Sequence, residues 1–359
     1  MSGRLTVADQ VELTNVTKRF NEVVAVDSIS LLIEPGEFFS ILGPSGCGKT
    51  TTLRMIGGFE HPDEGTIKIG ERIVNSVPAF KRNVGMVFQH LALFPHMDVF
   101  SNIAYGLKMK RVPKSDIADR VKGSLELVGL SGFEKRRISQ VSGGQRQRVA
   151  LARALVTEPN VLCLDEPLGA LDLKLRLQMQ VEIKRLQQKV KNTFIYVTHD
   201  QGEAITMSDR VAIMSAGKVE QVGNPREIYE HPKTKFVADF IGETNLFEAH
   251  ATSENAVELD GIMIDAAVSA EFVGGKVFVS VRPEDISLGR TIDNSISTRL
   301  EGVVEIAMYR GSYVTYKIRV GEKLLINTSG PSRGERLDSG DHVVLGWKKE
   351  DAVILPAAS

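Results

Sequence analysis

The feature that most constrains the fold of this chain is a glycine-rich stretch, ILGPSGCGKTT, at residues 41–51. From Gly43 to Thr50 it matches the pattern G-x-x-x-x-G-K-[ST], in which a loop joins a buried strand to the start of a helix. The apolar run FFSIL precedes it and a helix-compatible segment follows it. An ordinary glycine turn is the alternative, but the pattern arises by chance in roughly one chain of this length in a hundred. The sequence therefore predicts a cradle for phosphate groups.

Each residue type in this loop has a physical reason to lie beside a phosphate. Glycines let backbone N–H groups converge on the oxygens without Cβ clashes, and the helix N-terminus adds unpaired donors and partial positive charge. Lys49 is expected to reach the β- and γ-phosphates, Thr50 to bind Mg²⁺ and Thr51 to cap the α-phosphate. The predicted nucleotide-binding residues of the loop are Gly43, Pro44, Ser45, Gly46, Cys47, Gly48, Lys49, Thr50 and Thr51.

A second signal is the apolar run NVLCLDE, which ends in two acidic residues. A phosphate loop needs a carboxylate at the end of a hydrophobic strand to complete its metal site, and Asp165 is the expected partner of Mg²⁺. Glu166 is well placed to polarise the attacking water, as a general base or by fixing its orientation. Taken alone, the run could be a strand that leaves the core for a polar turn. Together with Lys49 and Thr50 it predicts a hydrolytic site.

A third stretch, VSGGQRQRVALARAL, indicates another anion-binding helix start. Ser142 is predicted to cap the helix, and Gly143 and Gly144 expose backbone N–H groups. Its arginines could indicate a surface that binds nucleic acid. They alternate with the residues of an apolar helix face, however, which favours a polar face that is simply exposed to solvent. No guanine-reading Asn-Lys-x-Asp motif occurs in the chain.

The order of apolar runs predicts an α/β fold followed by an all-β module. Residues 11–240 alternate short β-rich runs with helical stretches, which is typical of a mostly parallel sheet covered by helices. The runs VELTNV, VDSISLLI and GTIKIGE suit half-exposed antiparallel strands at one edge. In LDLKLRLQMQVEI the apolar residues alternate as in a strand, but length and composition favour a helix. From residue 246 onward only short strand patterns occur.

Composition narrows the cellular setting. A formal net charge of -1 gives no reason to expect a polyanion as an electrostatic partner. Two cysteines, Cys47 and Cys163, cannot build a disulfide framework in 359 residues, which fits a reducing cytoplasm. The first residues contain no apolar segment typical of a signal peptide, and no apolar run reaches the roughly 18 residues that cross a bilayer. If the protein works at a membrane, we expect other chains to hold it there.

Six motifs in a fixed order resemble the ATP-binding subunit of an ABC transporter. They are GPSGCGKT, VFQ, SGGQ, LCLDEP, LGALD and VTHD, and the resemblance spans about residues 11–240. It implies a dimer of these domains that sandwiches two ATP molecules with Mg²⁺. The loop with Lys49 in one copy would face the other copy's signature stretch, which comprises Ser142, Gly143, Gly144 and Gln145.

The resemblance also implies roles for four isolated residues. Phe20 falls where the family stacks an aromatic ring on adenine, and Gln89 falls in a loop that touches the metal and senses the membrane subunits. Asp172 ends the stretch LGALD, residues 168–172, which we call the crossing loop and which would lie at the dimer interface. His199 would contact the γ-phosphate. The implied catalytic group is therefore Glu166, His199, Lys49 and Gln89, and the implied metal ligands are Thr50, Gln89 and Asp165. Val141 replaces the more usual Leu before SGGQ, and Phe20 the more frequent Tyr, and both keep apolar or stacking character.

The second half of the chain narrows the branch of the family. The stretches NPREIYEHPKTKFVADFIGETNLFEA, VRPEDISL and GSYVTYKI are similar to importer ATPases that end in a transport-associated OB-like domain. Within that branch the sequence is most similar to the spermidine and putrescine importers, with ferric-iron, thiamine and sugar importers as alternatives. We predict an ABC-type nucleotide-binding domain at residues 1–244, with a helical subdomain at about 90–157, and an all-β OB-like domain at 245–359.

The resemblance implies particular partners and a location. The partners are a second copy of the chain, two integral-membrane permease subunits and, indirectly, an extracytoplasmic substrate-binding protein, with no nucleic acid. The chain would lie at the cytoplasmic face of the bacterial inner membrane. The rival class is a soluble ABC protein that remodels ribosomes or DNA ends, which typically has two cassettes or a long coiled-coil insertion. One cradle and a short interval from Gln89 to Ser142 argue against it, and Glu166 with His199 argues against an ATP sensor that never hydrolyses.

Overall fold

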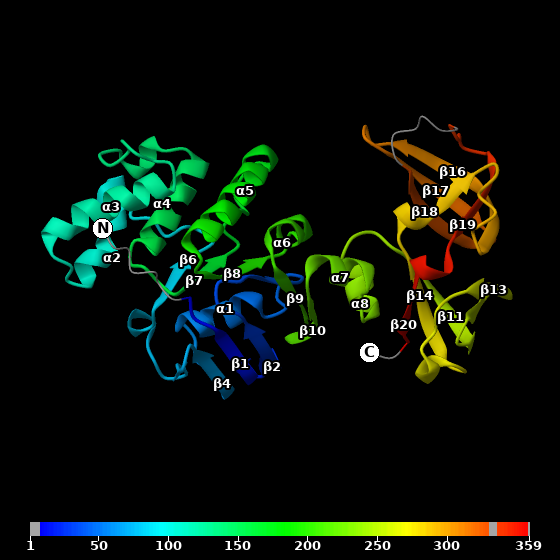
Figure 1. Cartoon of the computed structure of the whole chain (residues 1–359), viewed down its shortest axis with the longest axis horizontal. Coiled ribbons are helices and arrows are strands. Elements are labelled where there is room, and N and C mark those ends of the chain that lie inside the picture. Colours follow the sequence, from blue (N-terminus) through cyan, green and yellow to red (C-terminus); the bar gives the residue numbers. More distant parts are fainter. Residues whose placement is uncertain (1–7, 330–335, 358–359) are drawn as a thin grey trace. The chain divides into compact units, whose positions relative to one another are not determined.

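The structure is a computed structural model that describes residues 8–329 and 336–357 (Figure 1). Its internal contacts divide the chain into two compact units between Pro225 and Arg226. The predicted domain boundary after residue 244 lies 19 residues later, because the structure groups two short helices with the second unit. Each unit has its own hydrophobic core and is described separately below.

A six-stranded sheet with the order β10-β9-β3-β8-β7-β6 forms the centre of the first unit. Its strands are β3 (Phe38–Leu42), β6 (Val84–Val87), β7 (Val161–Asp165), β8 (Thr193–Thr198), β9 (Arg210–Ser215) and β10 (Lys218–Gly223). All neighbours pair in parallel except β10, which runs antiparallel to β9. Every residue of β3, β7 and β8 is buried, as expected for continuous apolar strands covered on both faces. The predicted α/β class is confirmed.

A second, antiparallel sheet with the order β2-β1-β4-β5 completes this unit. Its strands are β1 (Val11–Phe20), β2 (Val23–Ile33), β4 (Glu64–Ile69) and β5 (Arg72–Ile73). Buried and exposed positions alternate along much of β2, so one face packs on the core and the other meets solvent. The antiparallel edge strands expected from VELTNV, VDSISLLI and GTIKIGE are thus confirmed as strands.

Helices cover the parallel sheet. They are α1 (Lys49–Gly57), α2 (Val99–Met109), α3 (Lys114–Leu127), α4 (Gly143–Leu155), α5 (Leu173–Val190) and α6 (Gln201–Met207), with short 3-10 turns at Ala79–Lys81 and Ile138–Gln140. In Figure 1, α2, α3 and α4 gather beside α5, and all three lie within the predicted helical subdomain. The alternating stretch LDLKLRLQMQVEI is helical, as predicted, and buries Met179, Ile183 and Leu186.

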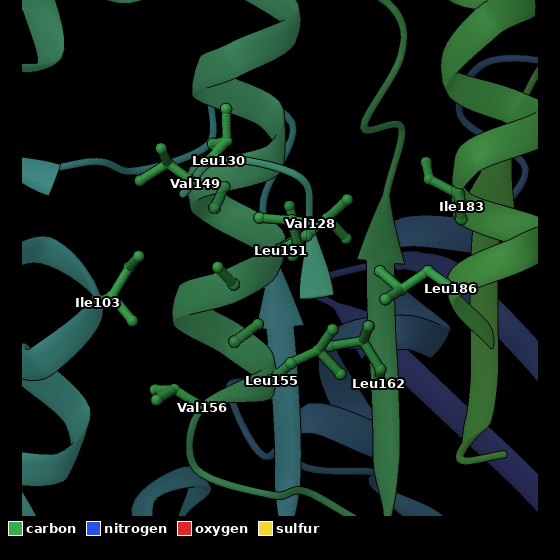
Figure 2. Packing of buried hydrophobic residues seen from close by; sticks show 14 of the residues in the cluster. Ile103, Val128, Leu130, Val149, Leu151, Leu155, Val156, Leu162, Ile183 and Leu186 are labelled. Atoms are coloured by element: carbon green, nitrogen blue, oxygen red, sulfur yellow. The ribbon is translucent and has the colours of Figure 1, made fainter. Parts of the chain in front are cut away.

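The core under α4 and α5 is built from aliphatic side chains on both helices. Figure 2 shows Leu155 of α4 and Leu186 of α5 near Leu162 of β7. All three residues belong to one cluster of buried residues, and Leu162 is fully buried. Burying such side chains contributes about 1.5–3 kcal/mol each, which fixes both helices against the sheet.

The second unit is mostly strands. One sheet has the order β13-β12-β11-β14-β20 and the other the order β15-β19-β16-β17-β18. The strands are β11 (Asn245–Ser253), β12 (Ala256–Leu259), β13 (Ile262–Asp265), β14 (Lys276–Val281), β15 (Ser287–Gly289), β16 (Thr298–Tyr309), β17 (Val314–Val320), β18 (Lys323–Ser329), β19 (His342–Trp347) and β20 (Ala352–Pro356). Three 3-10 turns lie at Ala270–Phe272, Pro283–Asp285 and Lys349–Asp351. The predicted all-β character is confirmed.

Two short helices, α7 (Pro225–Glu230) and α8 (Lys235–Phe240), precede these strands. The guanidinium of Arg282, just after β14, donates to main-chain oxygens of Tyr229 at 2.9 Å and of Ala238 and Glu243 at 3.1 Å. Since carbonyls near helix ends lack intrahelical donors, one buried guanidinium satisfies several of them. This contact joins α7 and α8 to the strands of the second unit.

One buried amide joins the two sheets of the second unit. Asn245, at the start of β11, donates to the main-chain oxygen of Ile326 at 2.7 Å and accepts from its N–H at 2.6 Å. Ile326 lies on β18, the edge strand of the other sheet. The side chain therefore completes the edge of β18 in the way a neighbouring strand would.

Asn245→Ala should destabilise the second unit by about 1–3 kcal/mol, because it leaves backbone groups of Ile326 without partners. Trp347 is the one tryptophan of the chain and is fully buried in this unit, so its fluorescence follows the unfolding of this unit. We expect a lower thermal midpoint for Asn245→Ala than for Asn255→Ala, which changes an exposed asparagine of the same unit. Equal midpoints for the two variants would contradict the bridging role.

Candidate nucleotide site

The predicted phosphate loop joins β3 to α1, as the sequence indicates. Gly48 caps α1 with φ 101°, and Gly46 has φ 80°, both in the left-handed region that favours glycine. A Cβ at Gly43 would lie 2.2 Å from the main-chain oxygen of Met214, and one at Gly48 would lie 2.4 Å from that of Ala25. At Gly46 a Cβ would meet no atom within 4 Å. The loop thus packs tightly at two glycines and opens to solvent at the third.

The ammonium of Lys49 is enclosed by its own loop. Lys49 is 5% exposed, and its Nζ donates to the main-chain oxygens of Gly43 and Pro44, each at 2.8 Å. No carboxylate forms an ion pair with it among the described residues. Buried cations are rare unless paired, so this arrangement leaves a positive charge that an anion can neutralise. The loop therefore fits a phosphate group.

The predicted metal ligands Thr50 and Asp165 meet although 115 residues separate them. Thr50 Oγ1 donates to Asp165 Oδ1 at 2.9 Å. Asp165 is 4% exposed; burial raises the pKa of its carboxyl, and the Thr50 hydroxyl and the Arg54 charge oppose this shift. A hydroxyl and a carboxylate side by side are oxygen donors of the kind that Mg²⁺ prefers. These residues fit a magnesium ion.

Three predicted catalytic residues form a second group beside this pair. Glu166 Oε2 accepts from Gln89 Nε2 at 3.1 Å, and Glu166 Oε1 lies 3.2 Å from His199 Nδ1. Glu166 has φ 42°, a left-handed conformation that costs a non-glycine residue about 1–2 kcal/mol. Its N–H donates to the main-chain oxygen of Val197 at 3.0 Å, which helps to hold that conformation. Strain of this kind clusters at functional sites.

The other predicted site residues have contacts elsewhere. Ser142 and Gln145 form a reciprocal capping box at the start of α4, as the sequence indicates for Ser142. Gly143 and Gly144 lie against Leu171 and Leu175, so the signature stretch packs near the crossing loop of its own chain. None of the interactions described for these four residues reaches the phosphate loop.

Phe20 and Asp172 also stand apart from the catalytic group. Phe20, at the end of β1, is 44% exposed, with Lys18 Nζ 5.3 Å from its ring centre. Asp172 caps α5 by accepting from the N–H of Leu175 at 3.0 Å. An exposed ring and an exposed cap are free to meet a ligand or another chain, and their predicted contacts remain predictions.

Sequence reasoning missed a buried polar network behind His199. Glu203 accepts hydrogen bonds from the hydroxyls of Tyr196 and Thr198, each at 2.7 Å. Burial raises the pKa of Glu203 and raises that of Tyr196 well above its usual range. The one available signal was the spacing of Asp200 and Glu203, which matches an N-cap followed by an acidic N3 residue.

Two glycines of the phosphate loop make a matched test of its packing. Alanine costs about 1–2 kcal/mol of backbone strain at Gly46 and at Gly48, because both have positive φ. Only at Gly48 does the new Cβ also collide with a main-chain oxygen. Without nucleotide, Gly48→Ala should therefore lower the thermal midpoint, followed by far-UV circular dichroism, clearly more than Gly46→Ala does. An equal loss in both variants would show that the close packing of the loop is not significant.

Comparison with known proteins places this site in a family. A profile described as "ABC transporter" matches residues 26–169, and one described as "TOBE domain" matches residues 279–355. The spermidine/putrescine import ATP-binding protein PotA of Rubrobacter xylanophilus is 50% identical over 355 residues, covering 96% of this chain and 93% of that protein. The protein of the same name from Thermobifida fusca is 46% identical over 367 residues, covering 99% and 95%.

Solved structures agree with these matches. A dimeric ATP-binding cassette in a post-hydrolysis state, bound to ADP and Pi, is 33% identical, with a TM-score of 0.54 over 60% of this chain and 99% of that chain. A component of an ABC transporter complex from Clostridium perfringens is 29% identical, with a TM-score of 0.57 over 61% and 89%. In the part of the chain that the structure describes, no helix is long and apolar enough to cross a membrane. The chain belongs to the ABC transporter family and is an ATP-hydrolysing subunit with a C-terminal TOBE domain.

Proposed function

We propose that this ATPase powers the import of a polyamine, such as spermidine or putrescine, through an ABC transporter. The observation that carries the hydrolytic part is the meeting of Gln89, Glu166 and His199 beside the Thr50 and Asp165 pair. The polyamine part is supported by the extended similarity to spermidine/putrescine import ATP-binding proteins. Ferric iron, thiamine and sugars are the alternative cargoes.

Thr50 and Asp165 would hold Mg²⁺, with Gln89 as a further contact. No group of three or more His, Cys, Asp or Glu side chains suited to a metal occurs among the described residues. Mg²⁺ bound with a nucleotide usually takes one or two protein ligands and completes its shell with phosphates and water, and the Thr50 and Asp165 pair suits that need. When bound, the ion neutralises the negative charge of the β- and γ-phosphates.

Different side chains of the site have different roles in hydrolysis. Lys49 neutralises phosphate charge from inside the loop, where its ammonium lies buried. Glu166 orients the attacking water and accepts its proton, and Gln89 and His199 hold the Glu166 carboxylate in place. His199, whose side chain is 56% exposed, is also accessible to the γ-phosphate.

A second copy of the chain supplies the rest of the site. The first turn of α4, with Ser142, Gly143, Gly144 and Gln145, presents backbone N–H groups at a helix N-terminus. Solved relatives of this chain are dimeric ATP-binding cassettes, so we infer that this turn faces the γ-phosphate held by the partner copy. Asp172 would lie at that dimer interface, and the exposed ring of Phe20 would stack on adenine.

The transporter would comprise this ATPase pair at the cytoplasmic face of the bacterial inner membrane and two integral-membrane permease subunits. An extracytoplasmic binding protein would select the cargo. Hydrolysis that requires two chains to close can then drive movement of the permeases, because closure changes with each ATP.

Glu166→Gln should reduce ATP turnover about a hundredfold or more, because the amide cannot accept the proton of the attacking water. ATP binding should persist, so the variant should accumulate as an ATP-bound dimer on size-exclusion chromatography. Glu158→Gln is the matched control, since Glu158 is an exposed glutamate that also has positive φ. Normal phosphate release by Glu166→Gln would remove Glu166 from the assigned role.

Cells that lack the gene should lose uptake of labelled spermidine or putrescine, and the wild-type chain should restore it while Glu166→Gln should not. Purification of the tagged chain from solubilised native membranes should bring down multi-span permeases, identified by mass spectrometry. Restored uptake of iron, thiamine or a sugar in place of polyamine would contradict the assignment of polyamine as the cargo. Ribosomal or DNA-repair partners without a permease would overturn the transport role.

A further inference from the structure

Arg176, near the start of α5, connects two loops of the first unit. Its Nη2 donates at 3.2 Å to the main-chain oxygen of Leu171, which directly precedes Asp172 in the crossing loop. Its Nη1 donates at 3.2 Å to Oδ2 of Asp200, which directly follows His199. One rigid guanidinium therefore spans the crossing loop and the loop that carries His199.

The third nitrogen of the same guanidinium lies near a buried carboxylate. Arg176 Nε lies 4.0 Å from Glu203 Oε1, and it is a buried polar atom without a hydrogen-bond partner among the described residues. Glu203 is 3% exposed, and its other oxygen accepts from Tyr196 and Thr198. Burial raises the pKa of the Glu203 carboxyl, and the hydroxyls of Tyr196 and Thr198 and, less strongly, the charge of Arg176 oppose that shift.

The same network clamps the backbone on both sides of His199. On one side, the hydroxyl of Thr198 donates to Glu203 and accepts from the N–H of Asp200 at 2.9 Å. On the other side, Asp200 caps α6 by accepting from the N–H of Glu203 at 3.1 Å. The imidazole between them lies 3.2 Å from Glu166. The backbone that carries His199 is therefore held by a network that Arg176 joins through Asp200 Oδ2.

We propose that Arg176 is a positioning residue for ATP hydrolysis, which keeps the His199 loop in register with the crossing loop that contains Asp172. This inference rests on the proposed roles of His199 and Glu166 in hydrolysis. Loss of the guanidinium leaves the phosphate loop untouched and releases the His199 loop from the crossing loop. The effect therefore falls on turnover, and the affinity for ATP is preserved.

A second ion pair on the same helix provides a matched control. Lys184 Nζ lies 2.7 Å from Asp209 Oδ1, and the side chain of Lys184 is 24% exposed, compared with 27% for Arg176. Lys184 therefore also joins α5 to a loop. Its partner Asp209 directly precedes β9, so it belongs to a later loop of the chain than His199 does. The two cations differ in which loop they hold.

Steady-state ATPase kinetics of the full-length chain with Mg²⁺ test the proposal. Arg176→Met should lower kcat about tenfold or more with little change in KM, because a small displacement of a catalytic side chain strongly slows the reaction. Lys184→Met should leave kcat and KM close to wild type. Arg176→Lys should recover part of kcat, since an ammonium can reach Asp200 or Leu171 but cannot form the two-pronged contact.

A variant of Asp200 tests the same contact from its other partner, in case Arg176→Met misfolds. Asp200→Asn retains the cap of α6 and removes the charge that faces Arg176. It should lower kcat as Arg176→Met does, and the double variant should be no slower than the slower single one, because both changes break one interaction.

Three outcomes would overturn the positioning role. They are a kcat of Arg176→Met equal to that of Lys184→Met, a rise in KM without a fall in kcat, and multiplicative losses in the double variant. The failure of the underlying proposal is distinguishable, because Glu166→Gln would then retain turnover whatever Arg176→Met does.

Discussion

The site depends on the parallel pairing of four neighbouring strands. In the order β3-β8-β7-β6, each strand ends at the same edge of the sheet, because parallel strands share a direction. Leu42 of β3 leads into the phosphate loop, and Thr198, Asp165 and Val87 end the other three strands. Each strand is thus followed within a few residues by a member of the site. The register of one sheet brings together groups that are far apart in the chain.

Much of this could be predicted because the signals are local. The phosphate loop needs only a strand, three glycines and a helix start within a short stretch, and the structure contains all of them in order. The helix that begins at Leu173 was predictable despite its alternating pattern, because the run is too long for an ordinary strand and its composition favours a helix. The strands of the second unit followed from short apolar runs between turns. Local sequence was sufficient wherever neighbours along the chain determine the conformation.

The rest depends on contacts that no local pattern records. The helices α7 and α8 span six residues each, and the guanidinium of Arg282, more than forty residues after them, satisfies their carbonyls. The left-handed conformation of Glu166 depends on its bond to Val197 in the next strand. In the sequence Arg176 is one of several cations along this helix, and its contacts with two loops appear only in the folded structure. Buried polar groups are expensive, so each needs a partner that tertiary structure supplies.

The carboxylate of Glu166 shows what this arrangement achieves chemically. A carboxylate has two oxygens with about four acceptor positions. Gln89 occupies one position on Oε2 and His199 lies beside Oε1, so both oxygens are restrained, and these two contacts do not fill the four acceptor positions. Contacts on both oxygens fix the plane of the group without saturating it. In the proposed mechanism an attacking water would therefore meet a carboxylate whose orientation is already set, at a residue that also has a left-handed backbone.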